Sequence, residues 1–234
     1  MAPLRTALCL HAQSSDLKFL NQVRNRIGKL LGSQAKFYEL ADQASNADAT
    51  LALRNAADGF VVIFSHGNSD YLRGGEYRSR MTGEQIEVEK FITRKDLVAF
   101  RGKVVFCMSC ESNGLAEACQ AAGAIAFVGF DEIPFNRFDD RGNPIGSPVL
   151  IKHCQEMIAD AVQAALERFL TGRATLDESV DYLRIWIAKT AVTYVRKMES
   201  KGVKERKEIA ALFLRIREGV KYYGVREVRF EIDG

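Results

Sequence analysis

The sequence lacks a long apolar run, an excess of one charge and a repeated or low-complexity tract, and each absence excludes a class of protein. The longest uninterrupted apolar stretch, residues 121–130, has ten residues and contains two glycines. A membrane-spanning helix needs about 20 apolar residues, so we expect no membrane span. The formal net charge is +3, from 33 Lys+Arg and 30 Asp+Glu. This balance does not supply the basic face that direct nucleic-acid binding requires.

Cysteine is also scarce, with five residues in the whole chain. An odd number of cysteines scattered through apolar segments argues against a disulfide-stapled secreted scaffold. The apolar run near the N-terminus is short and is soon followed by charged residues, so we interpret it as a first strand rather than a signal peptide. We therefore expect reduced thiols and a cytoplasmic location.

What remains is an ordinary globular composition, 47% hydrophobic over 234 residues. No linker is visible, and the sequence predicts one domain over 1–234. Within it we expect an α/β core over 1–132, a loop over 133–147, and a helical layer with an edge strand over 148–234.

The first half alternates strand and helix patterns. Apolar runs predict buried strands at 6–11, 35–40, 59–65, 102–109 and 124–130. Helical spacing predicts helices at 16–31, 47–57 and 114–122. Near-continuous apolar strands that alternate with helices indicate a mostly parallel sheet with helices on both faces.

Other segments depart from this alternation. The polar stretch 68–91 predicts a hairpin on the sheet edge, and residues 131–147 predict a long functional loop. After Pro148 the pattern predicts helices at 149–170, 176–200 and 204–218. The alternating end, 225–232, predicts an exposed edge strand.

Reactive side chains follow two of the predicted strands. One apolar strand ends in Ser65-His66-Gly67, and the next ends in Ser109-Cys110. Parallel strands meet at their carboxyl ends, so His66 and Cys110 should emerge side by side if the strands are neighbours. Histidine is the usual base for a thiol nucleophile. The Gly67 and Cys110 N–H groups could then form an oxyanion hole.

These motifs resemble the caspase-like, or clan CD, cysteine peptidases. Ser-His-Gly closes one apolar strand, and a second apolar strand ends in cysteine 44 residues after the histidine. The run 104–114, followed by a small-residue helix ending in Gly123-Ala124, looks most similar to the bacterial CHAT branch. The resemblance covers about residues 5–132. It implies a three-layer caspase-like sandwich with a helical C-terminal extension.

The resemblance also implies roles for the residues that match. Cys110 would be the nucleophile, His66 the general base and acid, and the Gly67 and Cys110 N–H groups the oxyanion donors. A third catalytic residue is usually absent from such enzymes or is a backbone carbonyl. The substrate would be a protein or peptide, and no metal or cofactor is implied. Bacterial relatives commonly act in antiviral defence or cell death and are switched on by an activating protein partner or by loop cleavage, a role we assign here to 131–147.

The expected substrate pocket follows from a departure from the family pattern. Members that cut after Arg or Lys often carry an acidic residue two positions before the cysteine, where this chain has Met108. We therefore take Met108, Asp131 and Glu132 as candidate pocket residues. The side chain preferred at the cleavage site stays open.

Two other functions remain as alternatives. The imperfect motif is compatible with a caspase-like scaffold or sensor subunit without catalysis. A flavodoxin-like small-molecule binder would need a phosphate loop after the first strand, for which 11–16 is a poor match. Zinc binding is disfavoured because Cys107 and Cys110, three apart on a strand, point to opposite faces. We expect core positions for the remaining cysteines and structural roles for His11 and His153.

Overall fold

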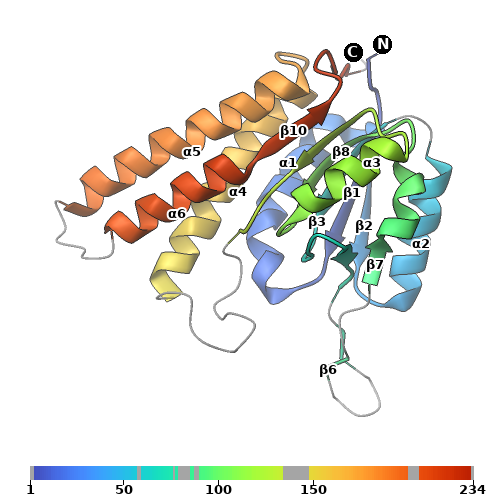
Figure 1. The fold of residues 1–234 in the computed structure, drawn as a ribbon, viewed down its shortest axis with the longest axis horizontal. Coiled ribbons are helices and arrows are strands. Elements are labelled where there is room, and N and C mark those ends of the chain that lie inside the picture. Colours follow the sequence, from blue (N-terminus) through green and yellow to red (C-terminus); the bar gives the residue numbers. More distant parts are fainter. Residues whose placement is uncertain are drawn as a thin grey trace.

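The computed structural model describes residues 3–56, 59–75, 77–78, 85–86, 90–133, 148–199 and 206–232. Its centre is a six-stranded sheet in the order β10-β9-β8-β3-β1-β2 (Figure 1). All neighbouring strands in it are parallel except β10, which is antiparallel to β9. The strands are β1 (Ala7–Ala12), β2 (Ala35–Leu40), β3 (Phe60–Phe64), β8 (Val104–Met108), β9 (Ala126–Gly129) and β10 (Lys221–Gly224).

Helices cover both faces of this sheet. The 3-10 segment η1 (Ser15–Leu20) leads into α1 (Asn21–Leu31), which lies beside α4 (Pro148–Leu170) on one face. The other face carries α2 (Gln43–Asn55), η3 (Arg94–Phe100) and α3 (Ala116–Ala121), as Figure 1 shows. Short 3-10 turns lie at η2 (Gly32–Gln34) and η4 (Ser112–Leu115). The predicted α/β class with a mostly parallel sheet and helices on both faces is confirmed.

The C-terminal helices extend one layer. Helix α5 (Leu176–Glu199) packs against α4 and against α6 (Arg206–Gly219), and β10 then returns the chain to the sheet beside β9. The three long helices lie within two residues of their predicted bounds. In the part of the chain that is described, no helix has both the length and the apolarity that crossing a bilayer takes.

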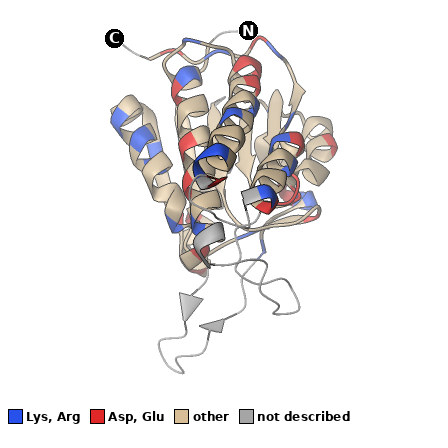
Figure 2. Cartoon of the chain, turned by 90° about the vertical axis from the view of Figure 1, so that its left-hand side faces the viewer, with Lys and Arg blue, Asp and Glu red and all other residues tan. Residues whose placement is uncertain are grey.

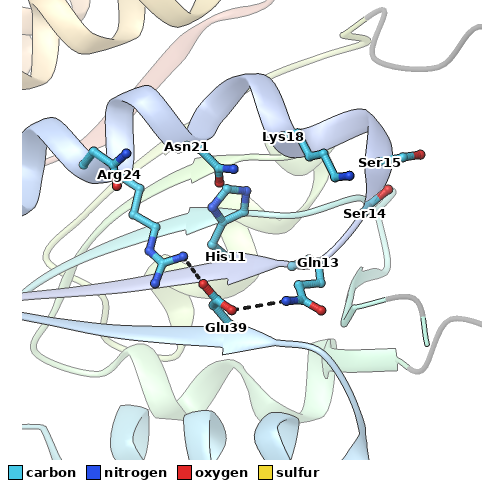
Figure 3. A pocket seen from close by; sticks show the side chains of 10 residues that line it. His11, Gln13, Ser14, Ser15, Lys18, Asn21, Arg24 and Glu39 are labelled. Atoms are coloured by element: carbon cyan, nitrogen blue, oxygen red, sulfur yellow. Dashed lines mark hydrogen bonds and ion pairs between the residues drawn. The ribbon is translucent and has the colours of Figure 1, made fainter. Parts of the chain in front are cut away.

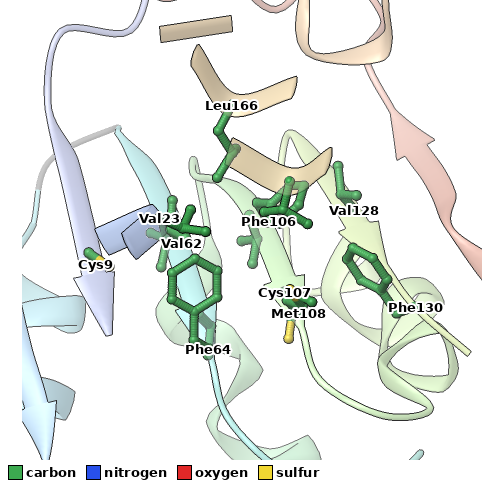
Figure 4. Packing of buried hydrophobic residues seen from close by; sticks show 14 of the residues in the cluster. Cys9, Val23, Val62, Phe64, Phe106, Cys107, Met108, Val128, Phe130 and Leu166 are labelled. Atoms are coloured by element: carbon green, nitrogen blue, oxygen red, sulfur yellow. The ribbon is translucent and has the colours of Figure 1, made fainter. Parts of the chain in front are cut away.

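The central strands are buried on both faces, as their near-continuous apolar sequences predict. Figure 4 shows Phe64 and Phe106 of the sheet packed beneath Val23 of α1 and Leu166 of α4. Four cysteines, Cys9, Cys107, Cys119 and Cys154, are also buried, which confirms their predicted core positions. Burial of such side chains from a parallel sheet contributes about 1.5–3 kcal/mol each.

One prediction about the less regular segments is wrong, and another is right only in part. Residues 225–232 do not form an edge strand: Phe230 makes one bridge to Leu4, while Val228 and Phe230 are buried. Their alternation reflects packing into the core, with Phe230 edge-on to Phe169, rather than a ladder. The segment 68–91 forms antiparallel pairs, as a hairpin does, but its described residues do not join the main sheet. Its described parts form separate two-stranded pairs between β4 (Tyr71–Arg73) and β7 (Lys90–Thr93), and between β5 (Tyr77–Arg78) and β6 (Gln85–Ile86).

Candidate active site

The ends of β3 and β8 lie next to each other. Phe64 pairs with Met108 in the parallel register, so His66 and Cys110 each follow two residues beyond the last pair. A Cβ atom on Gly67 would lie 2.5 Å from the Ser109 hydroxyl, closer than real Cβ atoms come. The turns after the two strands are therefore in direct contact, and this contact requires glycine at position 67.

The backbone N–H of Gly67 takes no part in the hydrogen bonds between this turn and the neighbouring strand β4. Gly67 faces Leu72 of β4 in an isolated antiparallel bridge. The hydrogen bonds lie on either side of that pair, from Arg73 N–H to His66 O (2.8 Å) and from Asn68 N–H to Tyr71 O (3.0 Å). In such a non-hydrogen-bonded pair, the N–H of the residue itself points away from the partner strand. This geometry leaves the Gly67 N–H available as the predicted oxyanion donor.

The His66 ring is half-buried and contacts the end of β1. Its Nε2 lies 3.2 Å from the hydroxyl of Ser14, which follows β1. Strand β1 lies between β2 and β3, so the strand order reverses there. The contact from Ser14 after β1 to His66 after β3 lies at this topological switch point, where doubly wound sheets bind ligands. Burial lowers the pKa of His66; the Asp16 carboxylate opposes this shift and the Arg73 cation adds to it. The imidazole is therefore neutral near pH 7 and can accept a proton.

The Cys110 thiol is directed to a different partner. Its Sγ donates a hydrogen bond to the Ile133 carbonyl oxygen at 3.2 Å, and no hydrogen bond joins these two described residues, Cys110 and His66. Burial, together with the nearby Glu132 and Glu111 carboxylates, raises the pKa of Cys110 to about 11. The structure thus brings the two predicted catalytic side chains to one sheet edge without a hydrogen bond between them, and with the thiol protonated.

The turn after Cys110 is tightly held. Glu111 adopts a left-handed backbone, with φ 54° and ψ 17°, which costs a non-glycine residue about 1–2 kcal/mol. Its N–H donates to Asp131 O at 3.1 Å. The buried Ser112 hydroxyl donates to Cys107 O and accepts from Phe130 N–H, both at 2.9 Å. These bonds fasten the turn to β9 and offset the strain at Glu111.

Replacing Ser112 by Ala should therefore destabilise the fold. The change removes the hydrogen-bond partner of the buried Cys107 carbonyl and of the buried Phe130 N–H. Leaving a buried polar group without its partner costs about 1–3 kcal/mol of folding free energy for each group. Urea unfolding followed by circular dichroism should show a loss of about 2–6 kcal/mol for the two groups together. Ser33→Ala, at an exposed position, is the matched control. A loss for Ser112→Ala no larger than that of the control would contradict the role of this hydroxyl.

The predicted substrate pocket around Met108 is partly wrong. Met108 is fully buried and points into the core (Figure 4), so it lines no accessible surface. The Asp131 carboxylate accepts from Asn113 Nδ2 at 2.6 Å and lies 3.4 Å from Lys221 Nζ, which ties β9 to β10. Glu132 is exposed and its charge acts on Cys110. Of the three, Asp131 and Glu132 are exposed, and Glu132 is the one whose charge acts on the thiol.

A cavity that the sequence did not predict lies on the other side of His66. It has a volume of about 540 Å³ and lies between the carboxyl ends of β1 and β2 and the start of α1 (Figure 3). Glu39 accepts from Arg24 and from Gln13 at its floor. Lys18 and Ser14 line the end nearest His66. Of its lining, only the segment 11–16 carries a sequence signal, a poor match to a phosphate loop. The hypothesis that the chain binds a small molecule there stays a prediction.

The two remaining histidines have structural surroundings. His11 is buried, lies 3.3 Å from Leu17 O through Nε2, and packs edge-on to Phe64. His153 on α4 packs against Tyr194. In the described ranges, no group of three or more His, Cys, Asp and Glu side chains is arranged to hold a metal ion.

Comparison with known proteins adds no assignment, since no protein-family model and no curated protein matches the chain. The functional argument therefore depends on the geometry of the strand ends and on the chemistry of the residues there.

Proposed function

We propose that this chain is a caspase-like cysteine endopeptidase, similar to the CHAT branch, that hydrolyses peptide bonds of a protein substrate. The observation that carries the proposal is the placement of His66 and Cys110 at equivalent positions beyond two neighbouring parallel strands. The Gly67 N–H, free of the β4 ladder beside them, supports an oxyanion hole. Five free cysteines support a reducing, cytoplasmic setting.

The proposed reaction proceeds through a thioester. His66, whose Nε2 contacts the Ser14 hydroxyl, takes the proton of the Cys110 thiol as the general base. Sγ then attacks the peptide carbonyl carbon, and the Gly67 and Cys110 N–H groups stabilise the oxyanion. The amine leaves with the proton from His66, and a thioester remains on Cys110. Water, deprotonated by His66, attacks the thioester and releases the acid and the thiol.

The proposed enzyme is latent in this conformation. The Cys110 hydrogen bond to Ile133 O must break before Sγ can turn toward His66. Ile133 leads into the segment predicted to be ordered or clipped, of which 134–147 lie outside the described residues. We propose that substrate or an activating protein partner, as in a bacterial defence or cell-death system, displaces this hydrogen bond.

A cleavage profile tests the proposal. Wild-type protein is incubated with a proteome-derived peptide mixture, and new peptide ends are identified by mass spectrometry. We expect ends that share one residue at the cleavage position, absent with Cys110→Ala and present with Cys154→Ala, whose thiol is buried on α4. The same new ends with wild type and Cys110→Ala would overturn the assignment.

The environment of Cys110 favours a second candidate, a non-catalytic caspase-like scaffold or sensor. A pKa raised to about 11 and a thiol hydrogen-bonded to a carbonyl suit a structural cysteine. The two candidate functions predict different reactions of Cys110 with a substrate-like electrophile. A mixture of peptidyl ketone electrophiles should label Cys110 in wild type but not in His66→Ala if the pair is catalytic, and should label neither if the chain is a scaffold.

Ser14 should act as a positioning residue for His66. Replacing Ser14 by Ala removes the hydroxyl 3.2 Å from Nε2 and frees the ring to rotate or change tautomer. We expect kcat to fall about tenfold with KM nearly unchanged, together with a shift in the acid limb of the pH profile. Ser14→Thr, which keeps the hydroxyl, should recover most of the rate. An equal loss in both variants, with no change in the pH profile, would show that the hydroxyl has no such role.

A further inference from the structure

Helix α5 carries two apolar stripes, of which the fold uses one. The inner stripe is buried against the rest of the molecule and consists of Leu183, Ile187, Ala191 and Tyr194. The outer stripe runs through Ile185, Ala188 and Val192, at the i, i+3, i+7 spacing of one helix face. Ile185 is 64% exposed and Val192 is 54% exposed. Large apolar side chains in line on one exposed helix face are typical of an interaction surface.

This outer stripe lines a groove. A hollow of about 770 Å³ extends along α5 and reaches Arg217 of α6, with Ile185, Ala188 and Val192 among its lining residues. Figure 2 looks at the side of the molecule where α5 and α6 lie in Figure 1 and shows bands of Lys and Arg, and also of Asp and Glu, along the helices. The surface is therefore an apolar strip with a charged border.

The charge on this border is mainly positive: the lining holds four cations and one carboxylate, Asp181. Arg184 is occupied, since it donates to Asp181 Oδ1 at 2.7 Å and to Val220 O. Lys189, Arg196 and Arg217 also line the groove, and no carboxylate of the described residues pairs with them. Cations beside an apolar strip attract a ligand that brings acidic side chains next to apolar ones.

We propose that the α5–α6 groove, defined by Ile185, Ala188, Val192, Lys189, Arg196 and Arg217, binds an acidic amphipathic helix of a partner protein. A helix docks in a groove through apolar residues at i, i+3, i+4 and i+7, a spacing that matches the stripe on α5. Glu or Asp side chains flanking that helix would meet Lys189, Arg196 and Arg217. The proposal concerns a surface separate from Cys110 and does not depend on catalysis there.

The shape of the groove favours a helix over two other ligands that a basic and apolar surface could bind, a membrane and a second copy of this chain. A membrane surface is flat, whereas these residues line a hollow between two helices, and only Ile185 and Val192 would insert. A second copy of this face would oppose Lys189, Arg196 and Arg217 to their own equivalents across a twofold axis, which repulsion disfavours.

The test uses fluorescent 18-residue peptides and the full chain. One peptide is an amphipathic helix with Leu on one face and Glu on its flanks, and its mate has Lys in place of every Glu. In fluorescence anisotropy, wild type should bind the Glu peptide at least tenfold more tightly than the Lys peptide. Val192→Glu should weaken binding of the Glu peptide at least tenfold. Leu51→Glu, at an exposed leucine on α2, is the matched control and should bind as wild type does.

A charge reversal completes the test. The triple variant Lys189→Glu/Arg196→Glu/Arg217→Glu should prefer the Lys peptide at least tenfold, while circular dichroism and thermal melting show an intact fold. Equal binding of both peptides by wild type, or unchanged binding in Val192→Glu, would overturn the proposal. Two further results would also overturn it. One is binding to phosphatidylserine vesicles in place of the peptide, and the other is a dimer in sedimentation in place of peptide binding, each lost in Val192→Glu.

Discussion

Replacing Cys110 by Ala should lower kcat/KM for a cleaved peptide by about 10⁴-fold or more, because the proposed reaction forms its thioester on the Cys110 sulfur. His66→Ala should cost a similar factor, since a thiol with a pKa of about 11 needs a base during attack. The double variant should be no worse than either single one, as expected for two residues that act as a unit. Initial rates on a synthetic peptide taken from the cleavage profile measure all three.

Matched variants separate this effect from damage to the fold. Cys154→Ala removes a buried thiol from α4, and His153→Ala removes a half-exposed imidazole from the same helix. Both should keep wild-type kcat/KM within about threefold. A large rate loss in Cys154→Ala, or a rate for Cys110→Ala within tenfold of wild type, would contradict the assigned roles.

The thiol of Cys110 in the uncomplexed chain should react unusually slowly with iodoacetamide. A pKa of about 11 leaves about one thiolate in 3,000 at pH 7.5, against about one in ten for a free cysteine. The higher intrinsic nucleophilicity of a more basic thiolate recovers about a tenfold part of this difference. We therefore expect alkylation at least tenfold slower than free cysteine, rising about tenfold for each pH unit up to about pH 10.

Peptide mapping of the alkylated protein measures that rate at Cys110 alone. Protein unfolded in urea is the control and should react at the free-cysteine rate. The sign of the effect follows from burial, which disfavours the charged thiolate. A folded-state rate equal to or above that of free cysteine, with a plateau above pH 8, would contradict the geometry in which Sγ donates to Ile133 O.

Much of the fold was predictable because strong local patterns coincide with the tertiary arrangement. The apolar runs at 60–64 and 104–108 form strands that are buried on both faces, and α4 and α5 keep their helical spacing over more than six turns. The adjacency of His66 and Cys110 followed from the parallel sheet, since consecutive strands of such a sheet commonly pair.

Other features depend on contacts that sequence patterns do not encode. The alternation of apolar and charged residues over 225–232 predicts an edge strand, but burial of Val228 and Phe230 in the core produces the same two-residue period without strand pairing. Met108 was assigned to a pocket by its position relative to Cys110, whereas the structure buries it in the core. The hydrogen bond from Cys110 to Ile133 joins residues that are 23 positions apart, and no local sequence pattern predicts it.

The cavity beside Ser14 was missed for a similar reason. Its wall combines residues that follow β1 with Lys18 and Arg24 from the next helices and with Glu39 from β2, so it exists only once the sheet has formed. Its polar residues come from the stretch 11–18, from α1 and from β2, and the one segment with a local pattern, 11–16, is only a poor match to a phosphate loop.

The most direct test of the proposed peptidase is detection of the acyl-enzyme. Wild-type protein is mixed with a peptide that it cleaves, quenched in acid within the first turnovers, and mapped by mass spectrometry. We predict a mass increase equal to the N-terminal part of the substrate on the peptide that contains Cys110, removed by hydroxylamine and absent in Cys110→Ala. Turnover of the peptide without any adduct, retained in Cys110→Ala, would contradict the assignment of Cys110 as the nucleophile.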